Sequence, residues 1–245
     1  DNIVMMLSAL LGSAAVFEAG ETVLVLDEIQ DCPEARTALK FFRMDGRYDV
    51  IGTGSLLGVK GYGKEPKSIP VGSETVIDMY PLDFEEFLWA NGVGAPLVEM
   101  LKKNLEMETP VPDALHNRMK QLLLQYTVVG GMPDAVQTFV DTKQMDKVLR
   151  IQRDIVRSYE DDMVKYAEKK DKSRIKECFQ SIPRQLSKEN KKFQYSVIKK
   201  GSTASKYTGS LQWIEDAGII ARCYNLSITE LPLDGNAEEE VFKVY

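Results

Sequence analysis

Over residues 1–91, short continuous apolar runs alternate with segments in which apolar residues recur at helical spacing. Short, uninterrupted apolar runs rich in β-branched residues are typical of strands covered on both faces, whereas apolar positions three and four residues apart are typical of helices. The alternation of these patterns predicts an α/β fold with a mostly parallel sheet. The expected elements are a core-facing helix over Ile3–Phe17, strands over Thr22–Glu28, Tyr48–Ser55 and Thr75–Tyr80, and helices over Glu34–Met44 and Pro81–Gly92.

A capping box marks the start of one predicted helix. Asp83 can accept a hydrogen bond from the backbone three residues later, where Glu86 can reciprocate. Such a start turns Phe84, Phe87 and Leu88 towards the interior, because they fall on one face of the helix.

The rest of the chain is helical in pattern. Gly130, Gly131 and Pro133 predict a tight bend between two helices. Between Ser173 and Leu226 the pattern gives a helix, a short segment, a second helix and a strand, which is the order of a winged helix-turn-helix domain. We therefore divide the chain into residues 1–91 (α/β), 92–172 (helical lid or linker), 173–230 (winged helix) and 231–245 (the start of a further domain).

Composition narrows the class of protein. The 245 residues are 44% hydrophobic, and the longest largely apolar run is too short to span a bilayer. The three cysteines are far apart and lack a CxxC spacing, which argues against disulfides or zinc and for a reducing cytoplasm. The chain opens on Asp1 without a basic leader, so we expect a fragment of a protein that is not secreted.

Charge is unevenly distributed along the chain. Between Asp141 and Lys206 there are 18 Lys and Arg against 10 Asp and Glu, an excess of eight positive charges, although the net charge of the chain is −6. This distribution fits a basic module attached to an acidic one. A basic module can meet nucleic acid, but a solvated helical surface explains the charge equally well.

An acidic pair follows the first predicted strand. In open α/β sheets ligands lie beyond the carboxyl ends of the strands, and successive strand residues point to opposite sides, so Asp27 and Glu28 can do two jobs. Asp27 would hold Mg²⁺ through its water shell, and Glu28 would polarise a water that attacks the γ-phosphate of ATP. This is the form of a Walker B motif. Ser55, which ends the next strand, is placed as the polar sensor of an AAA-type ATPase.

The phosphate-binding loop has one near match in the chain. In the stretch GVKGYGKE, Gly58, Gly63 and Lys64 are in register with GxxxxGK[ST]. Glu65, however, stands where the motif needs a hydroxyl and would repel phosphate. The stretch also follows the Walker B strand, whereas a P-loop precedes it. We therefore expect the true P-loop to lie outside this chain.

Five stretches occur together in the order and spacing of one known family. They are LVLDEIQDCPEARTALKFF, YDVIGTGSLLGV, SIPVGSETVIDMYPLDFEEFL, VVGGMPDAV and QWIEDAGIIARCYN. With them the chain resembles the prokaryotic AAA-type ATPases that carry a C-terminal domain of unknown function. The resemblance runs through nearly the whole chain, and the combination is specific although each stretch is short.

This resemblance implies a P-loop ATPase core that binds ATP and Mg²⁺, a helical lid and a winged helix. It also implies a strand and a P-loop before Asp1, and a nuclease-like domain that begins near the end of the chain. Asp27 and Glu28 match the family's Walker B pair, and Ser55 matches its sensor.

One position departs from the family. Many members have Gly-Arg or Gly-Lys before the YPLSFEEF motif, whereas Gly72 is followed here by Ser73. Ser73 cannot act as an arginine finger because it carries no charge. Compensation by a nearby lysine, slow hydrolysis and a nucleotide switch without fast turnover all stay open; the lysines are Lys60, Lys64 and Lys67.

Two functions from different classes remain. The first is an Mg²⁺-dependent ATP hydrolase that couples its nucleotide state to the winged helix. The second is a winged helix that binds DNA or a protein, attached to a degenerate nucleotide domain that does not hydrolyse ATP. Basic residues flanking the expected recognition helix suit phosphate contacts, namely Lys191, Lys192, Lys199, Lys200 and Lys206. We expect no membrane partner, and an oligomer remains possible.

Overall fold

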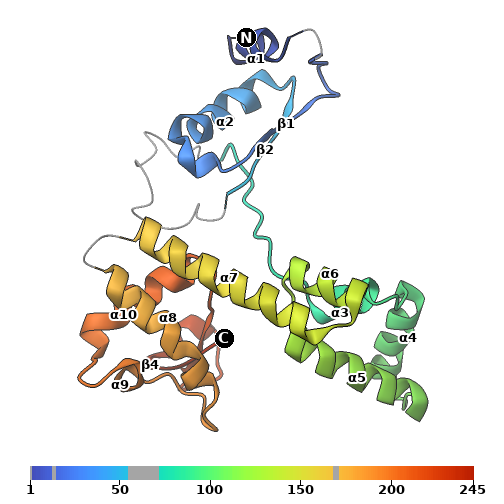
Figure 1. Cartoon of the computed structure of the whole chain (residues 1–245), viewed down its shortest axis with the longest axis vertical. Coiled ribbons are helices and arrows are strands. Elements are labelled where there is room, and N and C mark those ends of the chain that lie inside the picture. Colours follow the sequence, from blue (N-terminus) through green and yellow to red (C-terminus); the bar gives the residue numbers. More distant parts are fainter. Residues whose placement is uncertain (1, 13–14, 55–71, 168–170) are drawn as a thin grey trace. The chain divides into compact units, whose positions relative to one another are not determined.

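The computed structural model describes residues 2–12, 15–54, 72–167 and 171–245 (Figure 1). The chain divides into two compact units, of which one comprises residues 1–75 and 162–245 and the other residues 76–161. This division differs from the sequence-based boundary after residue 91, because the helix that begins at Phe84 packs on the helices that follow it.

The N-terminal part holds a two-stranded parallel sheet. Strand β1 (Val23–Leu26) pairs with β2 (Asp49–Gly52) in a register that runs from Val23 opposite Asp49 to Leu26 opposite Gly52. Between them lie a single 3₁₀ turn, η2 (Ile29–Asp31), and helix α2 (Pro33–Asp45). Proline at the first position and a left-handed Gly46 after the last one bound α2, as the sequence predicts.

Helix α1 (Asn2–Leu11) differs from its prediction in length and in burial. Gly12, with a φ of 72°, follows its last turn, so the helix is shorter than the run Ile3–Phe17. Its apolar side chains are largely solvent-exposed, with Leu10 at 80% and Met6 at 64%. The expectation of a core-facing helix is therefore wrong for the described residues.

Strand coverage also differs from the prediction. Leu24 is buried, but Val23 and Val25 on the opposite face are 51% and 62% exposed. The apolar run in β1 predicts that both faces of the strand are covered, but the described residues cover only the face of Leu24. Residues 75–80, predicted as a strand, form no regular element, and Ile77 and Met79 are almost fully exposed.

A helical unit follows, built from α3 (Phe84–Ala90), α4 (Ala95–Glu106), α5 (Asp113–Val129), α6 (Pro133–Thr142) and α7 (Met145–Tyr166) as far as Asp161. The capping box of α3 is present, since the Asp83 carboxylate accepts from the Glu86 amide and the Asp83 amide donates to the Glu86 carboxylate, both at 2.8 Å. This confirms the helix start read from the sequence.

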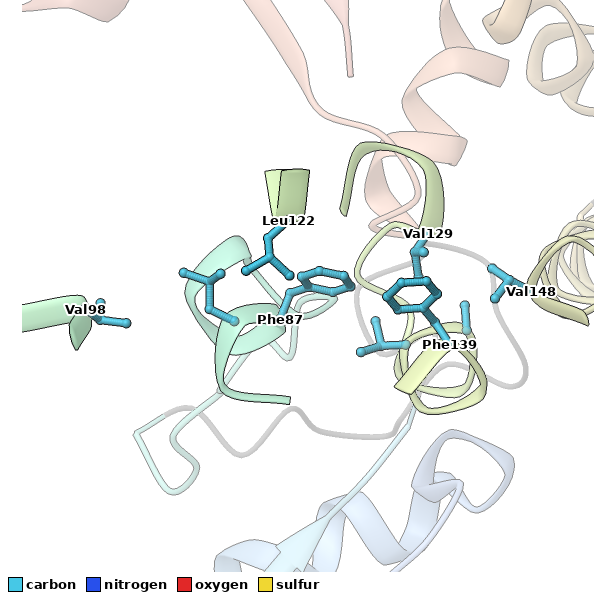
Figure 2. Packing of buried hydrophobic residues seen from close by; sticks show 9 residues of the cluster. Phe87, Val98, Leu122, Val129, Phe139 and Val148 are labelled. Atoms are coloured by element: carbon cyan, nitrogen blue, oxygen red, sulfur yellow. The ribbon is translucent and has the colours of Figure 1, made fainter. Parts of the chain in front are cut away.

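The core of this unit centres on Phe87, which is fully buried (Figure 2). Its ring stacks with that of Phe139 at 6.0 Å between centroids and lies 5.3 Å from that of Tyr126. Leu122 and Val129 complete the packing seen in the figure. Three helices are joined by these contacts, because Phe87 lies on α3, Phe139 on α6, and the others on α5.

The predicted bend between α5 and α6 has a further role. The Leu82 amide donates to the Gly131 carbonyl at 2.7 Å, and the Tyr126 hydroxyl donates to the Leu82 carbonyl at 2.8 Å. A Cβ at position 131 would overlap the Leu82 carbonyl oxygen. Glycine is therefore required at this position so that the segment before α3 can approach the bend.

The C-terminal part combines helices with an antiparallel hairpin. It contains α8 (Lys172–Leu186), α9 (Tyr195–Ile198), α10 (Ala204–Asp216), β3 (Arg222–Leu226) and β4 (Ala237–Val244), with a 3₁₀ turn, η3 (Leu233–Asn236), between the strands. Lys192 forms an isolated antiparallel bridge with Lys243 of β4. Because β4 pairs with β3, residues 237–244 are structurally continuous with the elements before them.

Buried side chains from α8 and α10 hold this part together. Tyr207, Leu211 and Ile214 line the inner face of α10, as their helical spacing predicts, with exposures of 3%, 0% and 0%. Burial raises the pKa of the Cys178 thiol on α8 to about 12, so this cysteine serves as an apolar packing residue. Among the helices of the described ranges, none is long and apolar enough to cross a membrane.

Candidate functional site

The acidic pair lies just beyond the carboxyl end of β1. Asp27 and Glu28 are both exposed and follow the last strand residue, Leu26. Thr53 follows the last residue of β2 and donates its hydroxyl to the Asp27 carboxylate through a short hydrogen bond. Backbone bonds fix this pairing, since the Thr53 amide donates to the Leu26 carbonyl and the Ile29 amide donates to the Thr53 carbonyl, both at 2.9 Å.

Glu28 adopts a left-handed backbone conformation, with φ 50° and ψ 46°. Such a conformation is unfavourable for a residue with a Cβ, by about 1–2 kcal/mol, and non-glycine residues held in it occur disproportionately at functional sites. The expectation that strand alternation separates the two carboxylates is wrong, because β1 ends at Leu26 and the chain turns at Glu28. The left-handed turn at Glu28, and not strand alternation, therefore sets the backbone geometry of this residue.

The buried side chain of Ile29 packs against β2 and holds this turn in place. Its side chain is 2% exposed, and a Cβ added at Gly52 would come within 2.9 Å of it. The small residue that ends β2 therefore makes room for Ile29. As a result, the Glu28 side chain remains at the surface, while the neighbouring Ile29 is held by packing.

Several predicted site residues lie outside the described residues. These are Ser55, assigned as the sensor, and the lysines that could replace an arginine finger, Lys60, Lys64 and Lys67. The near match to a P-loop, from Gly58 to Glu65, lies in the same range. Within the described part of the chain, no group of three or more His, Cys, Asp or Glu side chains is arranged to hold a metal ion.

The departure from the family at Ser73 lies beside two arginines of α2. Arg43 donates to the Gly72 carbonyl at 2.6 Å, and Arg36 forms an ion pair with Glu74 at 2.8 Å in which both side chains are 18% exposed. Two arginine side chains of α2 therefore contact the residues on either side of Ser73, one at the Gly72 carbonyl and the other at the Glu74 carboxylate.

A second candidate site is a pocket of about 380 Å³ between α8 and the start of α10. It brings together three of the five predicted nucleic-acid lysines, Lys199, Lys200 and Lys206. The other two, Lys191 and Lys192, are not among its lining residues, and Lys192 lies against β4. The remaining lining residues are Ser173, Arg174, Glu177, Gly201, Ser202 and Tyr207.

Glu177 organises one wall of this pocket. Lys199 donates to its carboxylate at 2.7 Å and Tyr207 donates to it at 2.5 Å. The hydrogen bond from Lys199 is the main cause that lowers the pKa of Glu177, and the hydrogen bond from Tyr207 is the next. The hydrogen bond to Glu177 in turn raises the pKa of Lys199. The contact ties the turn after α9 and the first turns of α10 to α8.

Among the residues of these two sites that sequence reasoning missed are Thr53, Arg174, Glu177 and Ser202. Thr53 could have been found from its position in the GTGS stretch, two residues before Ser55. Arg174, Glu177 and Ser202 carried no comparable signal, because nothing in their spacing shows that α8 packs against the start of α10.

Comparison with known families identifies the two halves of the chain. Residues 4–88 match the family model of an AAA domain. The sheet, α2 and the acidic pair all lie in this range, so the N-terminal part is an AAA-type ATPase-like domain. Residues 120–245 match a domain of unknown function (DUF8612), and the chain belongs to that family. No curated protein and no solved structure matches the chain.

Proposed function

We propose that the protein is an AAA-type ATP hydrolase that depends on Mg²⁺. The contact between Asp27 and Thr53 is the observation that carries the proposal. It fixes one carboxylate oxygen, Oδ1, at the edge of the sheet where ligands bind in open α/β folds. Oδ2 has no hydrogen-bond partner among the described residues, so it can accept from a water of the Mg²⁺ shell.

Glu28 has the role of the general base in this proposal. Its carboxylate lies one residue beyond Asp27 and is exposed, so a water can reach it. The left-handed backbone turns the side chain of Glu28 in a direction that a strand residue would not have. The packing of Ile29 supports that backbone conformation. Ser55 would add a sensor contact to the γ-phosphate, and a P-loop supplied outside these residues would hold the remaining phosphates.

The test is ATP turnover by the full-length protein with Glu28→Gln. The substitution removes the base and keeps the shape, so we expect turnover to fall at least about 100-fold while ATP still binds. Glu34→Gln is the matched control, because Glu34 is an exposed carboxylate in the first turn of α2. Unchanged turnover in the Glu28 variant would remove Glu28 as the base.

A second function is supported by the elements from α8 to β4. Their order, helix, short helix, helix and antiparallel hairpin, is that of a winged helix-turn-helix, with α10 as the recognition helix. Lys199, Lys200 and Lys206 cluster at the start of that helix, which suits contacts to DNA phosphates. We propose that the nucleotide state of the AAA domain is coupled to this module. A protein partner and a degenerate nucleotide domain are the alternative.

Binding of duplex DNA tests the second function. If α10 is the recognition helix, a duplex should bind at low salt, and the affinity should fall steeply as salt rises. Lys199→Glu with Lys200→Glu should abolish the binding by reversing two charges. A protein that binds no duplex at low salt would leave the winged helix as a site for protein contacts.

We also propose that the protein is cytoplasmic. The exposed cysteines Cys32 and Cys223 are free, which suits a reducing compartment.

A further inference from the structure

The pocket between α8 and α10 keeps an excess of positive charge after its internal ion pair is counted. Its lining contains Arg174, Lys199, Lys200 and Lys206, and its one carboxylate is Glu177. Lys199 already neutralises that carboxylate, and Arg174 lies 3.6 Å from Asp171. Among the described residues, neither Lys200 nor Lys206 has a carboxylate partner. Two cations are thus directed at the pocket without a counter-charge.

A buried hydroxyl in the same pocket lacks a partner. Ser202 lies between α9 and α10, and its Oγ makes no hydrogen bond within the described part of the chain. A buried polar atom without a partner is unfavourable, and in native structures such an atom commonly indicates a ligand, an ion or a water. This atom therefore points to a ligand independently of the charges.

The first turn of α10 adds further donors. The first amides of a helix have no intrahelical acceptor, and the N-cap residue Thr203 does not cap them with its side chain. Together with the helix dipole, such amides favour an anion. Ser202 directly precedes Thr203 in the chain, so the unpaired hydroxyl and the amides lie at the same end of the helix.

We propose that this pocket binds one phosphate monoester group. Lys200 and Lys206 would balance its charge of nearly −2, and the Ser202 hydroxyl and the amides of α10 would donate to its oxygens. A monoester has three terminal oxygens and protrudes from the molecule that carries it. It can enter a recess of about 380 Å³ that Ser202 lines. An internal phosphodiester of a duplex is held on both sides by sugars and cannot enter as far.

This inference shares lysines with the proposed DNA-binding function and deepens it. The phosphate monoester can come from the 5′-phosphate of a DNA end or from a small phosphorylated molecule. Two kinds of probe distinguish these sources. One is inorganic phosphate, and the other is a pair of short duplexes that differ only in carrying a 5′-phosphate or a 5′-hydroxyl.

The experiment is calorimetric titration of the whole chain with each probe. We expect saturable binding of inorganic phosphate, and competition by phosphate against the 5′-phosphorylated duplex. Lys200→Ala with Lys206→Ala should weaken phosphate binding by at least about tenfold, and Ser202→Ala should weaken it by about fivefold. Lys120→Ala is the matched control, since it removes an exposed lysine of α5 and should change nothing. Circular dichroism establishes that each variant is folded.

The outcomes separate this inference from DNA binding. Phosphate binding that is absent, or that survives in the folded double variant, overturns the monoester site. Equal affinity for the two duplexes with no competition by phosphate also overturns it, while DNA binding through α10 would stand. Phosphate binding without any duplex binding would support the site, remove DNA as the source and identify a small phosphorylated molecule as the ligand.

Discussion

The hydroxyl of Thr53 donates a hydrogen bond to the carboxylate of Asp27 across the carboxyl ends of two paired strands. The two residues are 26 positions apart in the sequence, and this is also the register offset of β1 and β2. The contact therefore extends the strand pairing by one position, from Leu26 opposite Gly52 to Asp27 opposite Thr53. Strand register is what positions the proposed magnesium ligand.

Removing this hydroxyl should destabilise the N-terminal part. Thr53→Val keeps the shape and β-branching of the side chain but removes the donor, so we expect the free energy of unfolding to fall by about 1 kcal/mol. Thr53→Ser retains the hydroxyl, so its free energy of unfolding should fall by less than half of that amount. Chemical denaturation followed by circular dichroism measures both. Equal stability of the Val and Ser variants would mean that the contact does not contribute.

Backbone strain at Glu28 makes a second prediction. Glu28→Gly and Glu28→Ala both remove the carboxylate, but glycine adopts φ 50° without a Cβ clash. We expect the Gly variant to be more stable than the Ala variant by about 1 kcal/mol, the reverse of their order in a regular helix or strand. Thermal unfolding of the two proteins tests this. A more stable Ala variant would show that Glu28 is not strained.

The bend at Gly131 should tolerate no side chain. Gly131→Ala would force its Cβ against the Leu82 carbonyl and disturb the two hydrogen bonds made by Leu82, so we expect a loss of at least about 2 kcal/mol of stability. Gly209→Ala is the control. Gly209 lies within α10, and a Cβ added there would meet no other atom within 4 Å, so this variant should gain about 0.5–1 kcal/mol. Unfolding midpoints compared at a constant m-value give both results.

The network around Glu177 should make stability depend on acid pH. The pKa of Glu177 is lowered in the folded protein, chiefly because Lys199 and then Tyr207 donate hydrogen bonds to its carboxylate. A carboxyl with a lowered folded pKa contributes stability above its unfolded pKa and loses it as the pH falls through the folded pKa. Glu177→Gln should therefore lose less stability than wild type between about pH 6 and about pH 3.

The matched variant for this experiment is Glu189→Gln. Glu189 is an exposed carboxylate after the end of α8, so its removal should leave the pH dependence as in wild type. Denaturation at a series of pH values measures the difference. If the Glu177 and Glu189 variants have the same pH profile, Glu177 does not contribute to stability through its two donors.

Local signals in the sequence predicted most of the helices. Pro33 and Gly46 bound α2, and the capping box at Asp83 starts α3, because each of these depends on residues within one turn of the helix end. The apolar face of α3 was also predicted, since helical spacing alone determines which residues share a face. These features need no knowledge of the rest of the fold.

Predictions that depend on cover by other elements were less successful. The apolar residues of α1, of one face of β1 and of the segment 75–80 predict buried elements, yet within the described residues these side chains are exposed. An apolar sequence shows that a face of an element needs to be covered, but it does not show which other element covers that face. For the same reason, the sequence did not show that residues 237–244 pair with β3.

The sequence by itself determined the acidic pair after an apolar strand, the bounds of α2 and the start of α3, the glycines of the bend and the basic character of the C-terminal half. The tertiary structure decided which residues meet. Strand register brought Thr53 to Asp27, and packing of α8 on α10 brought Glu177 to Tyr207. The physical reason is range: capping and periodicity act over a few residues, whereas register and helix packing join side chains that are more than 20 positions apart.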